Sequence, residues 1–132
     1  MPKVLIDTSA WVEFFRADGD PRYQQVIGRL LDEDDAAVCG ATLAEVLRGA
    51  RTDAEYRELT DRFSSLIYFP MPETLWATMG RHGSHLLRRG VTVPTMDLLI
   101  ATVAMENHAA VLHKDRHFPL IARHTALRLF VS

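Results

Sequence analysis

The sequence is poor in cysteine, with a single one, Cys39, among 132 residues. One cysteine excludes a disulfide framework and a zinc site built from several cysteines, and it suits a reducing cytosol. No run approaches the roughly 18 apolar residues that a transmembrane helix needs. The N-terminus lacks a basic segment followed by a long apolar run, so we expect no secretory signal and a cytoplasmic location.

The motifs of several enzyme classes are missing as well. There is no G-x-x-x-x-G-K-[ST] or G-x-G-x-x-G pattern, which argues against nucleotide-dependent classes, and no G-x-S-x-G elbow of a serine hydrolase. An excess of positive charge is also absent: a net charge of -2 and a pI near 6.3 predict poor nucleic-acid binding on bulk charge alone. The arginines of the middle third leave a basic face as a hypothesis: Arg48, Arg51, Arg57, Arg62, Arg81, Arg88 and Arg89.

Short apolar runs alternate with helical patterns along the chain, and no linker or repeat divides it. The length and the 48% hydrophobic content fit one soluble domain over residues 1–132. Strands are expected over residues 4–7, 37–40, 66–69, 110–113 and 127–131, and helices over about 9–16, 21–33, 42–50, 53–64, 73–88, 94–107 and 117–124. This alternation predicts an α/β fold, a three-layer α/β/α sandwich around a parallel sheet of about five strands, whose order the pattern does not give.

Acidic side chains fall near the ends of these strands. Asp7 closes the first strand, and Asp115 comes just after the fourth. Glu45 lies in the helix after the second strand, and Asp97 lies in the first turn of an almost entirely apolar helix. Because ligands of parallel sheets bind outside the carboxyl ends of the strands, all four acids are candidates for chemistry.

Each acid also has an ordinary structural explanation. Asp7 could cap the helix that follows it, and Thr42-x-x-Glu45 fits a capping box. The helix dipole favours Asp97, and Asp115 could cap a short helix or pair with a neighbouring base.

A shared sheet edge is what these separate explanations do not predict. Two carboxylates about 5 Å apart repel by roughly 3 kcal/mol at an effective dielectric constant near 20. A divalent cation would remove that conflict, and an all-oxygen ligand set favours Mg²⁺ or Mn²⁺ over zinc. Acid clusters of this kind support in-line phosphoryl displacement.

The histidines do not suggest a second site. His82 and His85, like His113 and His117, have helical spacings, but no third ligand is obvious in the sequence. We therefore expect most of them to be surface or hydrogen-bonded residues rather than zinc ligands.

Three segments carry a resemblance to a known family: "LIDTSAWVEFF", "ATLAEVLRGA" and "PTMDLLIATVAMENHAAVLHKDRHF". Together they resemble a PIN-domain protein, specifically a VapC-type toxin of a type II toxin–antitoxin system, over residues 3 to about 130. The resemblance implies a PIN-like sandwich and a Mg²⁺- or Mn²⁺-dependent endoribonuclease that leaves 5′-phosphate and 3′-hydroxyl ends. It also implies an RNA substrate, such as tRNA or another structured RNA, a cognate VapB-type antitoxin and a homodimer.

The resemblance also assigns roles to residues by position. The catalytic and metal-binding acids it implies are Asp7, Glu45, Asp97 and Asp115. By this resemblance, Asp7 and Asp97 would hold the main metal, and Glu45 and Asp115 would be further ligands or would orient water. Thr8 or Ser9 matches the hydroxyl that follows the first acid, and His113 departs from the Thr or Ser common at its position.

Two surfaces are expected to meet the partners. Arg48 and Arg51 lie a turn or more beyond Glu45 and are candidates to face the RNA backbone. The apolar and basic stretch at residues 74–89 is a candidate for the homodimer or antitoxin contact.

Two other functions stay open at this point. One is a catalytically weak PIN-fold module that acts by binding a partner and needs no acid cluster. The other is a Mg²⁺-dependent phosphatase, which is less favoured because Ser9 stands where enzymes of the haloacid-dehalogenase type place a second acid.

Overall fold

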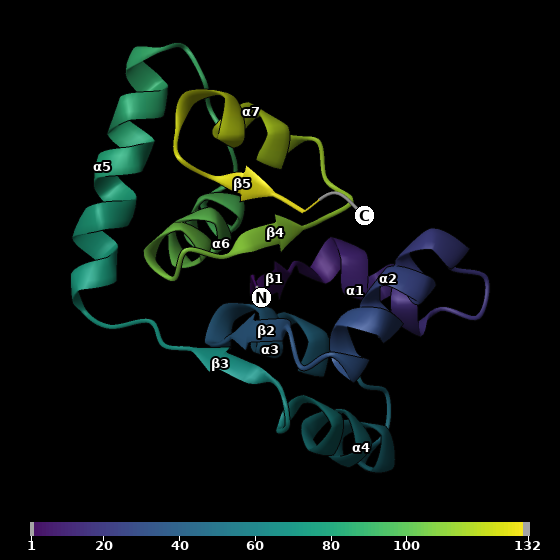
Figure 1. Cartoon of the computed structure of the whole chain (residues 1–132). Coiled ribbons are helices and arrows are strands. Elements are labelled where there is room, and N and C mark those ends of the chain that lie inside the picture. The colour runs from purple at the N-terminus through teal and green to yellow at the C-terminus, as the bar shows by residue number, and fades with distance from the viewer. Residues whose placement is uncertain (1, 131–132) are drawn as a thin grey trace.

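The structure is a computed structural model that describes residues 2–130, in which five strands alternate with seven helices (Figure 1). The strands are β1 (Val4–Ile6), β2 (Ala36–Cys39), β3 (Ile67–Phe69), β4 (Ala110–Leu112) and β5 (Arg128–Leu129). The helices are α1 (Thr8–Phe15), α2 (Pro21–Asp32), α3 (Gly40–Leu47), α4 (Asp53–Phe63), α5 (Thr74–Arg88), α6 (Thr95–Glu106) and α7 (His117–His124). The expected order of elements is confirmed, although residue 131, the expected end of the last strand, lies outside the described residues. None of the described helices is long and apolar enough to cross a membrane.

The five strands form one parallel sheet in the order β3-β2-β1-β4-β5. β1 lies at the centre, with Leu5 paired to Ala37 of β2 on one side and to Val111 of β4 on the other. The chain builds outward from β1 to β3 and then returns to add β4 and β5 on the opposite side. The strand order therefore reverses between β1 and β4, which is where ligands of such sheets bind.

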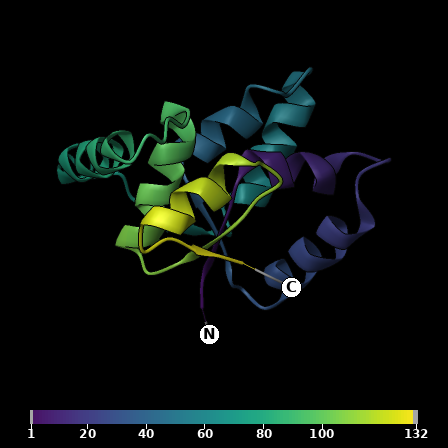
Figure 2. The same cartoon turned by 90° about the horizontal axis from the view of Figure 1, so that it is seen from above.

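Apolar residues cover both faces of the sheet, because side chains alternate along each strand. Val4 and Ile6 pack in one core with α1, α2 and Phe63 of α4. Leu5 packs in the other core with α5, α6 and α7. Figures 1 and 2 show these two groups of helices on opposite sides of the sheet. The predicted α/β/α sandwich with a parallel sheet of five strands is thus confirmed.

Candidate active site

Asp7 ends β1 and begins α1. Its backbone N–H donates to the carbonyl of Leu112 in β4 at 2.9 Å. Its side chain is only 6% exposed and accepts hydrogen bonds from the backbone N–H and the hydroxyl of Ser9 at 3.0 and 2.6 Å. Asp7 is therefore the N-cap of α1, and the same contacts hold its carboxylate at the seam between β1 and β4.

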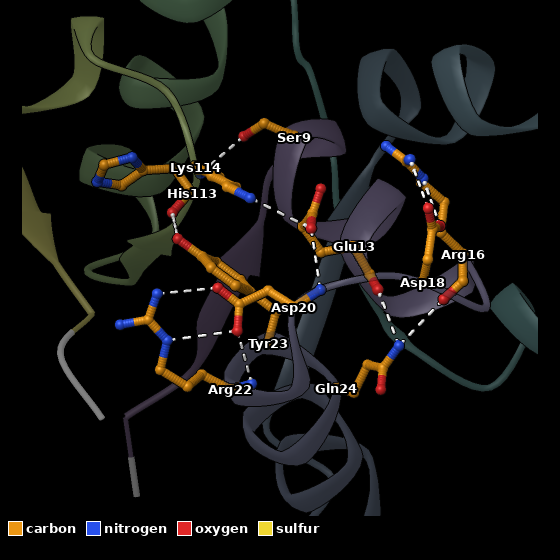
Figure 3. Close-up of polar contacts among 10 residues, drawn as sticks. All are labelled: Ser9, Glu13, Arg16, Asp18, Asp20, Arg22, Tyr23, Gln24, His113 and Lys114. Atoms are coloured by element: carbon orange, nitrogen blue, oxygen red, sulfur yellow. Dashed lines mark hydrogen bonds and ion pairs between the residues drawn. The ribbon is translucent and has the colours of Figure 1, made fainter.

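The loop after β4 is tied to α1 and α2 around this seam (Figure 3). The hydroxyl of Ser9 accepts a hydrogen bond from the backbone N–H of Lys114 at 2.9 Å, and Lys114 Nζ lies 3.2 Å from Glu13 Oε1. The Tyr23 hydroxyl donates to the carbonyl of His113 at 2.8 Å. These contacts fix the backbone immediately before Asp115.

Glu45 reaches the same region from α3. Its Oε1 accepts a hydrogen bond from the hydroxyl of Thr8 at 2.8 Å. The capping-box explanation for Glu45 is wrong, because the N-cap of α3 is Cys39 and the Thr42 hydroxyl contacts the Cys39 thiol at 3.5 Å. Glu45 is thus linked through Thr8 to the residue that follows Asp7.

Three side chains converge beyond β4 and the start of α6. His117 Nδ1 lies 3.0 Å from Asp97 Oδ2 and 2.8 Å from Asp115 Oδ1. One potential ligand atom from each of these residues lies within 4.8 Å of the others. Among residues 2–130, this is the group of potential metal ligands that lie so close together. Asp7 and Glu45 do not belong to it.

Burial and neighbouring charge act on the two acids of this group in opposite directions. Burial, then the charges of Asp115 and Asp7, raise the pKa of Asp97 to about 6. Burial also acts to raise the pKa of Asp115, but the hydrogen bond from the His117 backbone N–H, at 2.7 Å, and the charge of His117 outweigh it and lower the pKa. The charge of Asp7 therefore acts on Asp97, although Asp7 follows β1 and Asp97 lies in α6.

His117 is the residue that sequence analysis missed, since the histidines were expected to lie at the surface or in ordinary hydrogen bonds. Its side chain is only 25% exposed and stands between two acids. The signal for it was its position two residues after Asp115, at the start of the helix that follows β4. Helical spacing between histidines could not indicate a ligand group formed by one histidine and two acids from different elements.

His113 has a supporting place beside the acids. Its Nδ1 accepts a hydrogen bond from the backbone N–H of Asp115 at 3.1 Å, and its ring packs against Phe118. Burial lowers the pKa of His113, which favours the neutral ring that this acceptor role requires. His113 thus orients the loop that carries Asp115.

A groove of about 630 Å³ lies between α1, α3 and α4, with Thr8 and Glu45 in its wall. Three arginines line it, Arg16, Arg51 and Arg62, together with three glutamates, Glu45, Glu55 and Glu58, so its charged lining is balanced. The guanidinium of Arg62 lies 5.3 Å from the ring centre of Phe15, a cation–π contact. Of the two arginines expected to face a ligand, Arg51 lines the groove and Arg48 does not.

Known proteins that resemble this chain in sequence and in fold are PIN-domain and VapC proteins. The PIN domain family matches residues 4–124. The chain is 37% identical over 130 residues to the VapC ribonuclease Mb1587 of Mycobacterium bovis and to ribonuclease VapC11 of Mycobacterium tuberculosis, an alignment that covers 95% of this chain and 96% of each relative. The chain therefore belongs to the PIN-domain family, and its motifs and identity group it with the VapC proteins, as the resemblance predicted.

Solved structures share the fold at lower identity. VapBC2 from Rickettsia felis, bound to a DNA fragment from its promoter, gives a TM-score of 0.76 at 21% identity over 96% of both chains. VapBC-5 from Mycobacterium tuberculosis, a member of the VapBC family of toxin–antitoxin systems, gives 0.63 at 24% identity over 97% of this chain and 98% of that one. These likenesses support the fold of the described residues.

Proposed function

We propose that this chain, as one PIN-like domain over residues 1–132, is a metal-dependent endoribonuclease toxin that a cognate VapB-type antitoxin neutralises. One observation carries the proposal: acids from β1, α6 and the end of β4 interact at the reversal of strand order, in a chain 37% identical to ribonucleases over nearly its whole length. The ordinary structural explanations account for Asp7 and Asp115 as helix caps. The helix dipole and His117 favour Asp97 as well, but they do not account for its burial beside the charges of Asp115 and Asp7.

The side chains fit a divalent cation. Asp97 Oδ2 is buried and has no hydrogen-bond partner among residues 2–130, and burial together with nearby negative charge raises the pKa of Asp97. A buried carboxylate in that position is costly unless a cation compensates it. We propose that Asp7, Asp97, Glu45 and Asp115 hold Mg²⁺ or Mn²⁺, which would activate water and neutralise the oxygens of the phosphoryl group.

The residues around the acids would then have distinct roles. Ser9 and Thr8 orient the carboxylates of Asp7 and Glu45 through their hydroxyls. The His113 ring accepts a hydrogen bond from the Asp115 backbone N–H and so steadies the loop that carries this acid. Together these contacts hold the acids before substrate arrives, and such preorganisation is what lowers the barrier in phosphoryl transfer.

The groove between α1, α3 and α4 is the path that we propose for the RNA. Its wall includes Glu45, one of the four proposed ligands, which supports a path for RNA that leads to the acids. Arg51 and Arg62 would contact the RNA backbone, with Glu55 and Glu58 of the same groove limiting its net positive charge. A structured RNA such as tRNA would cross this groove with a single-stranded segment.

A homodimer contact fits α5. Trp76 and Leu87 are eleven residues apart, which places them on one helix face, and they are 49% and 63% exposed. We propose that a second copy of the chain covers this face, while a VapB-type antitoxin blocks the acids.

Cleavage of total cellular RNA by the purified protein tests the proposal. The reaction is run with Mg²⁺, with Mn²⁺ and with EDTA, beside Asp97→Asn and the control Asp32→Asn. Asp32 is an exposed acid just before β2, at the opposite edge of the sheet, so its variant makes the same charge change away from the site.

We expect wild type and Asp32→Asn to give discrete fragments with 5′-phosphate ends in either metal. EDTA and Asp97→Asn should each reduce cleavage by about a thousandfold or more, as loss of an electrostatic stabiliser does in other enzymes. Folded wild-type protein that binds neither ion and leaves the RNA intact would contradict the proposal and favour a partner-binding module.

A further inference from the structure

We propose that His117 is a direct ligand of the cation, and that its nitrogen makes the site prefer Mn²⁺, or another transition ion, over Mg²⁺. This inference rests on the proposed metal-dependent function and adds a ligand of a different chemical kind to the four acids. The ligand group of the described residues contains His117 together with Asp97 and Asp115.

The spacing of the three atoms fits coordination. His117 Nδ1 is 3.0 Å from Asp97 Oδ2 and 2.8 Å from Asp115 Oδ1. Adjacent ligand atoms of an octahedral ion with bonds of about 2.1 Å stand about 3 Å apart. The histidine nitrogen therefore already occupies the distance from both acids that neighbouring ligands of one ion would have.

His117 lies at ion-pair distance from both acids, but its hydrogen-bond alignment with Asp97 is poor. Both Asp97 Oδ2 and His117 Nδ1 are buried, and neither has a hydrogen-bond partner among residues 2–130, although they lie at ion-pair distance. Asp97 as a whole is only 9% exposed. Two buried polar atoms that lie 3.0 Å apart without a well-aligned hydrogen bond could both be satisfied by a shared cation.

The backbone holds the imidazole in place. His117 is the first residue of α7, and its backbone N–H donates to Asp115 Oδ1 at 2.7 Å. The Asp115 carboxylate therefore lies beside the His117 ring and also accepts a hydrogen bond from the His117 backbone. This arrangement fixes the position of His117 relative to Asp115 before any ion binds.

Ligand chemistry then sets the preference among ions. Mg²⁺ takes oxygen ligands and keeps several waters, whereas imidazole suits transition metals. Replacing one oxygen by nitrogen therefore strengthens binding of Mn²⁺ relative to Mg²⁺. The set contains too few nitrogen and sulfur ligands for a structural zinc site.

Metal binding and pulsed EPR of the Mn²⁺-loaded full-length protein test the inference without reference to activity. Echo-envelope modulation from ¹⁴N appears when an imidazole is bound to Mn²⁺. His117→Gln removes the imidazole, His117→Asp replaces it by an oxygen ligand, and His108→Asn is the control. His108 is exposed before β4, at the opposite sheet edge, and its φ of 52° is one that asparagine accepts.

We expect ¹⁴N modulation in wild type and His108→Asn, and none in the other two variants. His117→Gln should weaken Mn²⁺ by at least about tenfold, as loss of a supporting ligand group does, and change Mg²⁺ affinity by less than about threefold. His117→Asp should restore binding while favouring Mg²⁺ more than wild type does.

The opposite results are equally specific. If His117 only neutralises the acids, its removal frees them, and His117→Gln would bind Mn²⁺ at least as tightly as wild type, with no ¹⁴N modulation in either. That result with metal-dependent RNA cleavage intact would overturn the role of His117 and leave the proposed function standing. ¹⁴N-coupled Mn²⁺ without any RNA cleavage would support the ligand and overturn the nuclease.

Discussion

Asp97 differs from the other acids because the basic partner of its carboxylate, His117, is shared with a second acid, Asp115. Asp7 caps α1, Glu45 accepts from Thr8, and Asp115 accepts from the start of α7. Asp97 Oδ2 is buried and lacks a hydrogen bond among the described residues. A residue that costs folding energy without an evident structural return is a candidate for function.

Asp97→Asn should make the metal-free protein more stable. The change removes a charge that is buried and that Asp115 and Asp7 repel. We expect a gain of about 1–2 kcal/mol in the free energy of unfolding at pH 8, since each unit of pKa shift corresponds to about 1.4 kcal/mol. Urea titration in EDTA measures it, with Asp32→Asn as the unchanged control. A clear loss of stability would show that the carboxylate supports the fold.

The gain should depend on pH in a defined direction. The pKa of Asp97 is raised to about 6 in the folded protein, above its ordinary value, so the folded state takes up this proton first. As pH falls from 8 through about 6, the wild-type carboxyl becomes neutral and its repulsion disappears. The stability difference between wild type and Asp97→Asn should therefore shrink between pH 8 and pH 5. A difference that stays constant over this range would contradict the raised pKa.

Among the helices, α6 shows how far the sequence predicts structure. Its almost continuous apolar composition predicted a buried helix with Asp97 in its first turn, and six of its apolar and small residues are buried there: Leu99, Ile100, Ala101, Thr102, Val103 and Ala104. The run is informative because only a helix packed on several sides hides so many apolar residues. Glu45 was harder, because a short local pattern could not reveal that its partner, Thr8, is 37 residues away.

His117 marks the limit of that reasoning. Its helical spacing from His113 drew attention to the wrong pair, whereas the relevant neighbours are Asp115, two residues before it, and Asp97 from another helix. The partner from α6 follows from strand order, which periodicity does not encode. The sequence predicted that Asp115 lies just after β4, but it could not predict that Asp97 of α6 would meet His117 there.

Two helical glycines give a matched pair of substitutions. A Cβ added at Gly28 of α2 or Gly80 of α5 meets nothing within 4 Å. Because alanine loses less chain entropy in a helix, Gly28→Ala and Gly80→Ala should each raise the free energy of unfolding by about 0.5–1 kcal/mol in dilute solution. Thermal unfolding measures both, and a loss of stability would indicate a hidden contact.

The two variants should differ in self-association. Gly80 lies between Trp76 and Leu87 on the face of α5 that we propose for the homodimer. A methyl group there would hold a second helix away, whereas the methyl group of Gly28→Ala lies on α2. Sedimentation should show a weaker dimer for Gly80→Ala alone. Equal association of both variants would place the dimer contact elsewhere.

For the whole molecule, a cation that binds only the folded chain should add stability. At one hundred times its dissociation constant, Mn²⁺ should raise the free energy of unfolding by about 2.7 kcal/mol. Calorimetry with and without the ion measures the gain, which Asp97→Asn should lose and Asp32→Asn should keep. An equal gain in Asp97→Asn would place the ion outside the acid cluster.

The distance along the chain between Asp7 and His117 has a consequence for synthesis. The two sides of the seam between β1 and β4 are joined by the Ser9 hydroxyl and the Lys114 backbone, 105 residues apart. A nascent chain that has emerged only as far as α5 holds Asp7 and Glu45 but neither Asp97 nor Asp115. A ribosome that makes this protein must therefore translate past the codon for Asp115 before the new chain carries all four acids of the proposed site.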